Sequence, residues 1–220
     1  MNLLVLLLAL AGCRNDTGVT TFNANPDAEI TSHSDGEEVL EGYTESFRGA
    51  VSDSDNSTED LSAAWYLDDE VACEAAAPLD LGLTLCDIQI PADATEVSLV
   101  VQDPDNAAGS ARVSFTVIPT DSPQVEILSP TADGVYYSDQ KITFEGVVTD
   151  GEDAAGDLVA EWESDLEGVL ALDVEPDDDG TIAGAGYLAE GEHFLTLTAE
   201  DTTGKTGSDN VTVSVGPPNT

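Results

Sequence analysis

The chain has 220 residues, and its 45 acidic side chains against 5 basic ones give a formal net charge of −40 at pH 7. Such a charge repels phosphate backbones and anionic lipid surfaces, so nucleic acid is not an expected partner. It also destabilises a compact state through self-repulsion unless salt or bound cations offset it, which makes cations the first ligands to consider. The length is enough for one large domain or two small ones.

The N-terminus carries an apolar run at residues 3–11. The run is shorter than the roughly 20 residues of a transmembrane helix and is typical of a signal-peptide h-region. It leads into the sequence LAGC at positions 10–13, which resembles the bacterial lipobox. The resemblance implies that residues 1–12 are a lipoprotein signal peptide and that Cys13 is lipidated. No Lys or Arg precedes the apolar run, in departure from the usual pattern, and the alternative is an ordinary secretory signal with a coincidental cysteine.

The lipid would hold the protein on a membrane without a transmembrane helix, since each buried methylene contributes about 0.8 kcal/mol. Arg14 stands where an inner-membrane retention signal usually has Asp, which favours the outer membrane, on its periplasmic or surface-exposed face. Residues 13–24 are rich in Asn, Asp, Thr and Gly and are expected to form a flexible tether. The sequence therefore predicts a lipid-anchored protein of the cell envelope.

Two copies of one sequence pattern make up most of the remaining chain. A shift of 97 residues aligns Trp65 with Trp162, and after one inserted residue Asp103 aligns with Asp201. Such self-similarity at a fixed spacing indicates a duplicated domain. The expected segments are domain 1 at 25–119, a linker at 120–122, domain 2 at 123–216 and a tail at 217–220.

Within each copy apolar residues alternate with Thr or Ser at the period of two that is typical of a strand. The alternation is clearest at residues 142–144, 195–199 and 211–215. Runs rich in Gly, Asp and Pro, such as 201–204, are expected to be turns. Residues 70–77 are the one stretch for which we expect a short helical turn. The chain should therefore be all-β, with two tandem antiparallel sandwiches.

Cys73 and Cys86 remain once Cys13 is assigned to lipid, and an even pair in an exported protein is expected to form a disulfide within domain 1. A thiol catalyst or metal site is the alternative, although no His lies near either cysteine.

Trp65 and Trp162 follow an acidic turn near the middle of each copy, where a sandwich buries a large aromatic side chain between its sheets.

Short motifs in the second copy point to a family of domains. They lie at residues 127–130, 146–150, 162–165, 191–193 and 201–204, and in the final Val-x-Val-x-Val strand. Together they resemble bacterial immunoglobulin-like and polycystic-kidney-disease-like (PKD-like) domains of secreted proteins. The resemblance covers residues 25–119 weakly and 122–216 better, and it implies two immunoglobulin-like β-sandwiches. A strict PKD domain has Phe-Gly-Asp-Gly shortly after the tryptophan, and this motif is absent from both copies.

Acidic residues recur in equivalent loops of the two copies. If these loops cluster at one end of each sandwich, their carboxylates suit Ca²⁺, which takes roughly six to eight oxygen ligands. PKD-like domains often bind calcium in such loops, so the resemblance implies the same. We predict one calcium ion per domain, held by Asp53, Asp55 and Asp103 in domain 1 and by Asp150, Asp153 and Asp201 in domain 2. The alternative is that these are solvated aspartates that form turns, as we expect for the acidic run at 173–179.

Signatures of catalysis are absent from the sequence. His33 and His193 are its only histidines, and it contains no Gly-x-Ser-x-Gly, His-Glu-x-x-His or phosphate-binding glycine loop. We expect a non-catalytic spacer or adhesive module, stabilised by calcium, that binds a surface protein or glycan and reaches the membrane through its N-terminal lipid. The alternative is a carbohydrate-binding or accessory module associated with an extracellular enzyme, which 5 Tyr and 5 Phe residues support only weakly.

Overall fold

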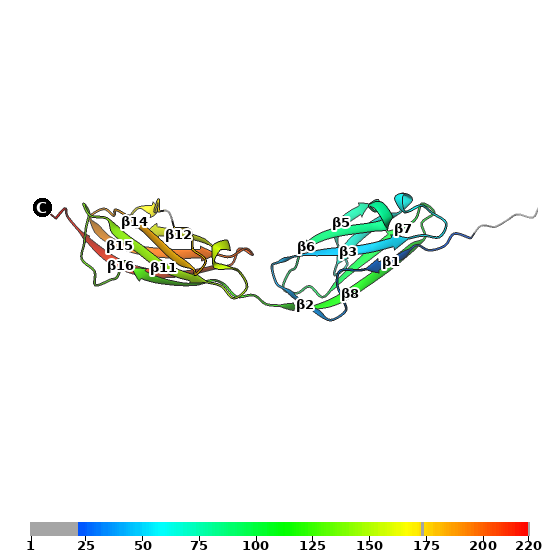
Figure 1. The fold of residues 1–220 in the computed structure, drawn as a ribbon, viewed down its shortest axis with the longest axis horizontal. Coiled ribbons are helices and arrows are strands. Elements are labelled where there is room, and N and C mark those ends of the chain that lie inside the picture. Colours follow the sequence, from blue (N-terminus) through cyan, green and yellow to red (C-terminus); the bar gives the residue numbers. More distant parts are fainter. Residues whose placement is uncertain (1–21, 173, 220) are drawn as a thin grey trace, which may run out of the picture.

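The computed structural model describes residues 22–172 and 174–219, which form two β-sandwiches placed end to end (Figure 1). The expected all-β fold is therefore confirmed. Besides strands, the described residues contain three short 3-10 turns, at Thr58–Asp60 (η1), Asp80–Gly82 (η2) and Ala155–Asp157 (η3). No helix in this part of the chain is long and apolar enough to cross a membrane. Cys13 and most of the expected tether lie outside the described residues.

Domain 1 packs a three-stranded sheet against a five-stranded one. The smaller sheet has the order β1-β3-β6, with β1 at Asp27–Ile30, β3 at Thr44–Ser52 and β6 at Leu83–Gln89. The larger sheet has the order β2-β8-β7-β4-β5, with β2 at Glu37–Leu40, β8 at Ala108–Ile118, β7 at Glu96–Gln102, β4 at Ser62–Leu67 and β5 at Glu70–Ala76. Neighbouring strands are antiparallel except β2 and β8, which are parallel.

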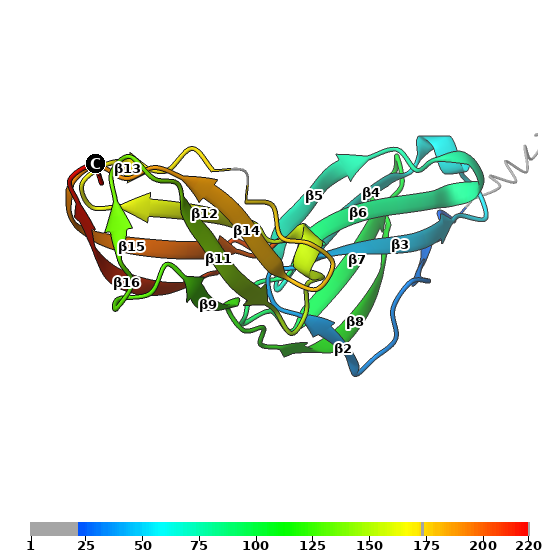
Figure 2. The same cartoon turned by 60° about the vertical axis from the view of Figure 1, so that its left-hand side comes forward.

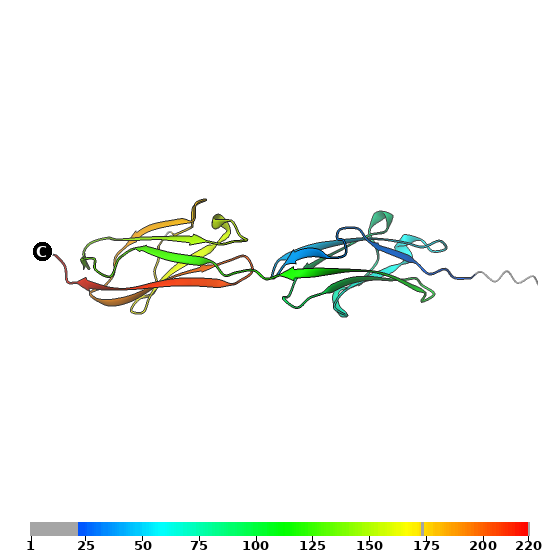
Figure 3. The same cartoon turned by 90° about the horizontal axis from the view of Figure 1, so that it is seen from below.

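Domain 2 repeats this arrangement. Its smaller sheet has the order β14-β11-β9, with β14 at Thr181–Gly186, β11 at Ile142–Thr149 and β9 at Gln124–Ser129. Its larger sheet has the order β10-β16-β15-β12-β13, with β10 at Tyr136–Tyr137, β16 at Thr206–Gly216, β15 at Gly191–Glu200, β12 at Val159–Ser164 and β13 at Gly168–Val169. Figure 3 shows the two layers of each sandwich and the single linker that connects the two domains. The duplication in the sequence is thus a duplication of topology.

The core of each sandwich is centred on its tryptophan. Trp65 is 2% exposed and Trp162 is 0% exposed, which confirms that both lie between the sheets. The close packing around them explains a repeated glycine on the strand that faces them. A Cβ on Gly49 would lie 2.5 Å from Cδ2 of Leu99, and a Cβ on Gly146 would lie 2.6 Å from Cδ2 of Leu197, the equivalent leucine of domain 2. A larger residue at this position would therefore push the two sheets apart.

The expected helical turn at residues 70–77 is wrong, because this stretch is strand β5. A tight turn at Asp68 and Asp69, which have φ values of 44° and 70°, reverses the chain so that β5 pairs with β4. Pairing with a buried strand outweighs the weak local preference for a helix.

The predicted disulfide is confirmed: Cys73 on β5 is bonded to Cys86 on β6, with Cα atoms 6.0 Å apart. It links the free edges of the two sheets, which lie side by side in Figure 2.

Candidate functional site in the acidic loops and the joint between the domains

The predicted ligands of domain 1 lie in two loops at the end where the chain enters the sandwich. Asp53 Oδ1 accepts the backbone N–H of Asp55 at 2.8 Å, and Asp103 Oδ1 accepts two backbone N–H groups of its own turn at 2.9 and 2.8 Å. The preceding segment connects the loops. The Asn23 amide donates to Asp103 Oδ2 at 2.6 Å, and the backbone N–H of Ala24 donates to Asp55 Oδ2 at 3.1 Å. The structure therefore brings these loops to one end of the sandwich.

The predicted ligands of domain 2 lie at the equivalent end, which faces domain 1. Asp150 Oδ1 accepts two backbone N–H groups of its own loop, both at 2.9 Å. Asp201 Oδ1 accepts the backbone N–H of Thr203 at 2.8 Å and its hydroxyl at 2.7 Å. The hydroxyl of Thr202 donates to Asp153 Oδ1 at 2.8 Å and so connects the two loops.

Four of the six aspartates thus close turns, which is the role that their alternative interpretation assigned to them. Asp55 and Asp153 instead accept hydrogen bonds from neighbouring segments. Among the described residues, no group of three or more Asp, Glu, His or Cys side chains is placed to hold a metal ion. Two carboxylate oxygens are nevertheless unpaired in this part of the chain, because Oδ2 of Asp53 and Oδ2 of Asp150 are buried without a hydrogen-bond partner. Calcium binding by these loops stays a prediction.

Proximity of the carboxylates also shifts their ionisation. The close approach of the two side chains lowers the pKa of Asp53 and raises the pKa of Asp55, since one carboxyl of a neighbouring pair ionises more readily than the other. Burial opposes the ionisation of Asp201, but hydrogen bonds from Thr203 and Lys205 outweigh it, so the pKa of Asp201 lies below its ordinary value.

A polar joint between the domains is a feature that the sequence reasoning missed. Lys205 Nζ donates to the carbonyl oxygen of Thr120 at 2.6 Å and to its hydroxyl at 2.8 Å, and lies 3.3 Å from Glu41 Oε2. The lysine belongs to domain 2, the threonine to the linker and the glutamate to domain 1. The three residues are far apart in sequence, and the one signal was a lysine in an acidic loop of a chain with few basic residues.

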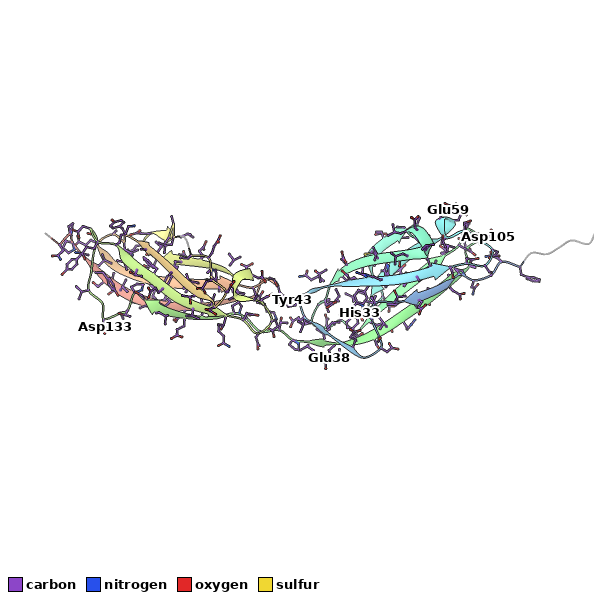
Figure 4. The ribbon with its side chains drawn as sticks, in the orientation of Figure 1. His33, Glu38, Tyr43, Glu59, Asp105 and Asp133 are labelled. Atoms are coloured by element: carbon purple, nitrogen blue, oxygen red, sulfur yellow. A yellow bond between two sulfur atoms is a disulfide. The ribbon has the colours of Figure 1, made fainter. Side chains whose placement is uncertain are left out.

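A turn of domain 1 packs against the acidic loops of domain 2 beside this lysine. A Cβ on Gly42 would lie 2.9 Å from Thr203 Cβ, so the joint requires a residue without a side chain at this point. Tyr43 lies at the same end of domain 1 (Figure 4). Burial raises the pKa of Tyr43 to about 12, and a hydrogen bond to Asp153 together with its charge adds to the shift. The loops predicted to bind calcium in domain 2 therefore form one side of the joint.

The other residues considered from the sequence have structural positions. His193 is fully buried, with Nδ1 2.8 Å from the hydroxyl of Ser164 and Nε2 2.9 Å from the carbonyl oxygen of Ala189. His33 stacks on Phe47 with ring centroids 4.2 Å apart. In the second acidic run, Asp173 lies outside the described residues, and Asp177 Oδ1 accepts two backbone N–H groups of its turn at 3.0 and 2.8 Å.

Exposed aromatic side chains are spread over separate parts of the described chain. Phe22 is in the segment before β1, Tyr187 follows β14, and Phe194 is on β15.

Comparison with known proteins identifies no family. No protein-family model matches the chain, and no curated protein matches it. Among solved structures, the fibronectin(III)-like modules of Clostridium thermocellum CbhA are 16% identical with a TM-score of 0.43, over 86% of this chain and 94% of that one. A 1.5-MDa bacterial ice-binding adhesin is 17% identical with a TM-score of 0.47, over 89% of this chain and 67% of that one. These are likenesses of fold and carry no conclusion about activity.

Proposed function

We propose that this protein is a non-catalytic spacer of the cell envelope, in which two sandwich domains are held as one stiff unit that serves adhesion. The observation that carries the proposal is the joint formed by Glu41, Thr120 and Lys205. Domains joined by a short linker move relative to each other unless contacts across the joint prevent it. A module that acts through its length needs such contacts.

The charges of the joint support this role. Glu41 of domain 1 faces the loops of Asp153 and Asp201 in domain 2, and in a chain with a net charge of −40 such surfaces repel each other. Lys205 lies between them and is one of only five basic residues. Its ammonium group therefore offsets the electrostatic repulsion between the two domains.

Small-angle X-ray scattering of the full chain tests the stiffness. We expect one extended shape whose distance distribution agrees with the structure. Lys205→Met should broaden this distribution, whereas Lys141→Met, which removes an exposed lysine of the same domain away from the joint, should leave it unchanged. A wild-type distribution as broad as that of the Lys205 variant would contradict a stiff spacer.

Anchoring through Cys13 is part of the proposal and is supported by the sequence at positions 10–13. It would hold the spacer on the membrane at the end where the chain enters domain 1. Labelled palmitate should be incorporated by the wild type and not by Cys13→Ser. Equal labelling of the two proteins would remove the lipid anchor from the proposal, while the stiffness of the spacer would be unaffected.

We also propose that calcium bound in the acidic loops stabilises both domains. What supports it is the buried, unpartnered Oδ2 of Asp53 and of Asp150, which a cation completed by water and backbone oxygens would satisfy. Calorimetric titration and thermal melts at fixed ionic strength test it, since a ligand that binds only the folded state raises its stability. We expect saturable binding near one ion per domain, lost in domain 2 when Asp150→Ala and Asp201→Ala are combined. A melting temperature that depends on ionic strength alone would leave these residues as turn-forming aspartates.

A further inference from the structure

Four leucines of domain 1 lie on the protein surface around η2 and the first half of β6. Their exposed fractions are 55% for Leu79, 97% for Leu81, 38% for Leu83 and 51% for Leu85. We refer to these four residues as the leucine surface. They lie at the free edge of the smaller sheet, next to the edge strand of the larger one. Scattered apolar residues on a surface are ordinary, but large ones gathered in one place mark a contact site, and Leu79, Leu83 and Leu85 line a common groove.

The duplicated domain provides an internal comparison, because it builds the same turn from other residues. Gly82 and Gly180 have φ values of 77° and 80°, and each donates its N–H to the residue three positions before it. A Cβ on either glycine would overlap a carbonyl oxygen of the neighbouring strand, that of Val51 on β3 for Gly82 and that of Val148 on β11 for Gly180. The residues of domain 2 that replace the four leucines in this frame are Asp177, Asp179, Thr181 and Ala183. The turn therefore does not require leucine at any of the four positions.

The leucines also weaken the turn in two ways. Asp177 Oδ1 accepts the N–H groups of Asp179 and Thr181, and Leu79 in its place has no side-chain acceptor. Leu81 adopts a left-handed conformation, with φ 62° and ψ 19°, which a branched apolar residue rarely takes. These residues add exposure and backbone strain without burial in the core. We take this as the sign of a surface kept for a contact outside the chain.

A groove beside the leucine surface gives it a shape. Its volume is about 280 Å³, and Leu79, Leu83 and Leu85 line one side of it. This is slightly below the roughly 300–1,000 Å³ of pockets that hold small molecules. The size is suited to an apolar side chain inserted from a protein surface. The buried hydroxyl of Thr84, which has no partner among the described residues, also lines the groove, whereas Ile182 takes its place in domain 2.

The charges around the leucine surface restrict what can cover it. The exposed acidic residues on its border are Asp27, Glu29, Glu59, Glu74, Asp80 and Asp87. Glu59 is labelled at this end of domain 1 in Figure 4. Arg48, directly across from Leu85 on β3, is the one basic neighbour among the described residues. An acidic rim repels a second copy of the same surface and an anionic membrane, and it attracts a partner with a basic rim.

We propose that the leucine surface is a docking site for a protein partner that inserts an apolar side chain into the groove and surrounds it with Lys or Arg. This arrangement of an apolar centre and a charged rim is that of specific protein interfaces. The inference rests on the proposed spacer only in that the spacer presents this surface. Loss of docking and loss of stiffness are therefore measured separately.

The test uses synthetic peptides as probes and a variant of the full chain that changes no charge. The variant combines Leu79→Asn, Leu81→Asn, Leu83→Thr and Leu85→Ala. A control variant of domain 2 combines Val159→Thr, Leu166→Asn and Val169→Thr, which removes apolar side chains of similar exposure. The probes are short peptides of alternating lysine and leucine and of alternating lysine and serine.

Calorimetry should show that the lysine–leucine peptide binds the wild type and the control variant equally. Its affinity for the leucine-surface variant should be lower by a factor of about ten or more, because a few central apolar residues carry most of the affinity of an interface. The lysine–serine peptide should bind all three proteins weakly and alike. Circular dichroism melts of both variants establish that they are folded.

Two outcomes would overturn the proposal. Equal affinity of the lysine–leucine peptide for the wild type and the leucine-surface variant would mean that net charge alone attracts it. Self-association of the wild type in sedimentation, lost in the leucine-surface variant, would assign the surface to a second copy of the chain instead. Neither result depends on the scattering measurement that tests the spacer.

Discussion

Replacing Lys205 by Met should uncouple the two domains without unfolding either of them. The methylene stem of lysine and the methionine side chain are similar in size, so packing at the joint is largely kept. What is lost is the ammonium group, with its hydrogen bonds to Thr120 at 2.6 and 2.8 Å and its ion pair with Glu41 at 3.3 Å. The expected effect is therefore electrostatic and can be estimated from the structure.

Coulomb's law at the distance between Lys205 and Glu41 gives an upper bound of about 5 kcal/mol with an effective dielectric constant of about 20. The side chains are 28% and 25% exposed, so solvent screening and the loss of ammonium hydration reduce this value strongly. Exposed pairs are measured at about 0.2–1 kcal/mol, and a hydrogen bond to a charged group contributes about 1.5–3 kcal/mol at best. We expect Lys205→Met to lower the free energy of unfolding by about 1–2 kcal/mol.

A double-mutant cycle with Glu41→Gln separates the ion pair from the hydrogen bonds. Urea unfolding followed by the fluorescence of Trp65 and Trp162, one in each domain, gives the stability of both domains in the same experiment. The coupling energy of the pair should be about 0.5–1 kcal/mol and should fall with added salt. A coupling below about 0.2 kcal/mol, or an equal loss in Lys141→Met, would refute the assignment of Lys205 to the joint.

Three further predictions concern single features of the fold. Replacing Cys73 and Cys86 by Ser should cost domain 1 about 3 kcal/mol in urea unfolding, because the disulfide closes a loop with a sequence separation of 13; an unchanged stability would contradict this. Gly82→Ala should destabilise domain 1 by more than about 1 kcal/mol, since a Cβ would overlap a carbonyl oxygen at positive φ, whereas Gly151→Ala, which meets open space, should cost little. Tyr43 should ionise at about 12, so the stability it contributes is complete below pH 10 and is lost as the pH rises through 12. Absorbance titration should show this transition in the wild type and not in Tyr43→Phe, and an ordinary pKa near 10 for Tyr43 would contradict its packing against the loops of domain 2.

The sandwich fold could be predicted because its signal is local. Alternation of apolar and polar residues fixes which face of a strand is buried, and the duplication doubles the evidence at each position, as Trp65 and Trp162 illustrate. Residues 70–77 were assigned wrongly because β5 owes its conformation to pairing with β4, a contact that no local pattern encodes. The joint was missed for the same reason, since Lys205 and Thr120 are 85 residues apart. The structure brings the aspartate loops together at one end, as the calcium prediction assumed, but their turn-closing bonds depend on backbone geometry that the sequence does not encode.

The two copies differ at the end of the sandwich that receives the preceding chain. In domain 2, Lys205 lies in a turn where its N–H donates to Asp201, and its side chain reaches back to the linker. In domain 1 the same turn has Ala107 donating to Asp103, with no side chain that could reach a neighbour. The shared turn shows that the fold accepts either residue. Lysine is therefore required by the joint and not by the sandwich. At the equivalent end of domain 1, Asp103 instead accepts a hydrogen bond from the side-chain amide of Asn23, in the segment before β1.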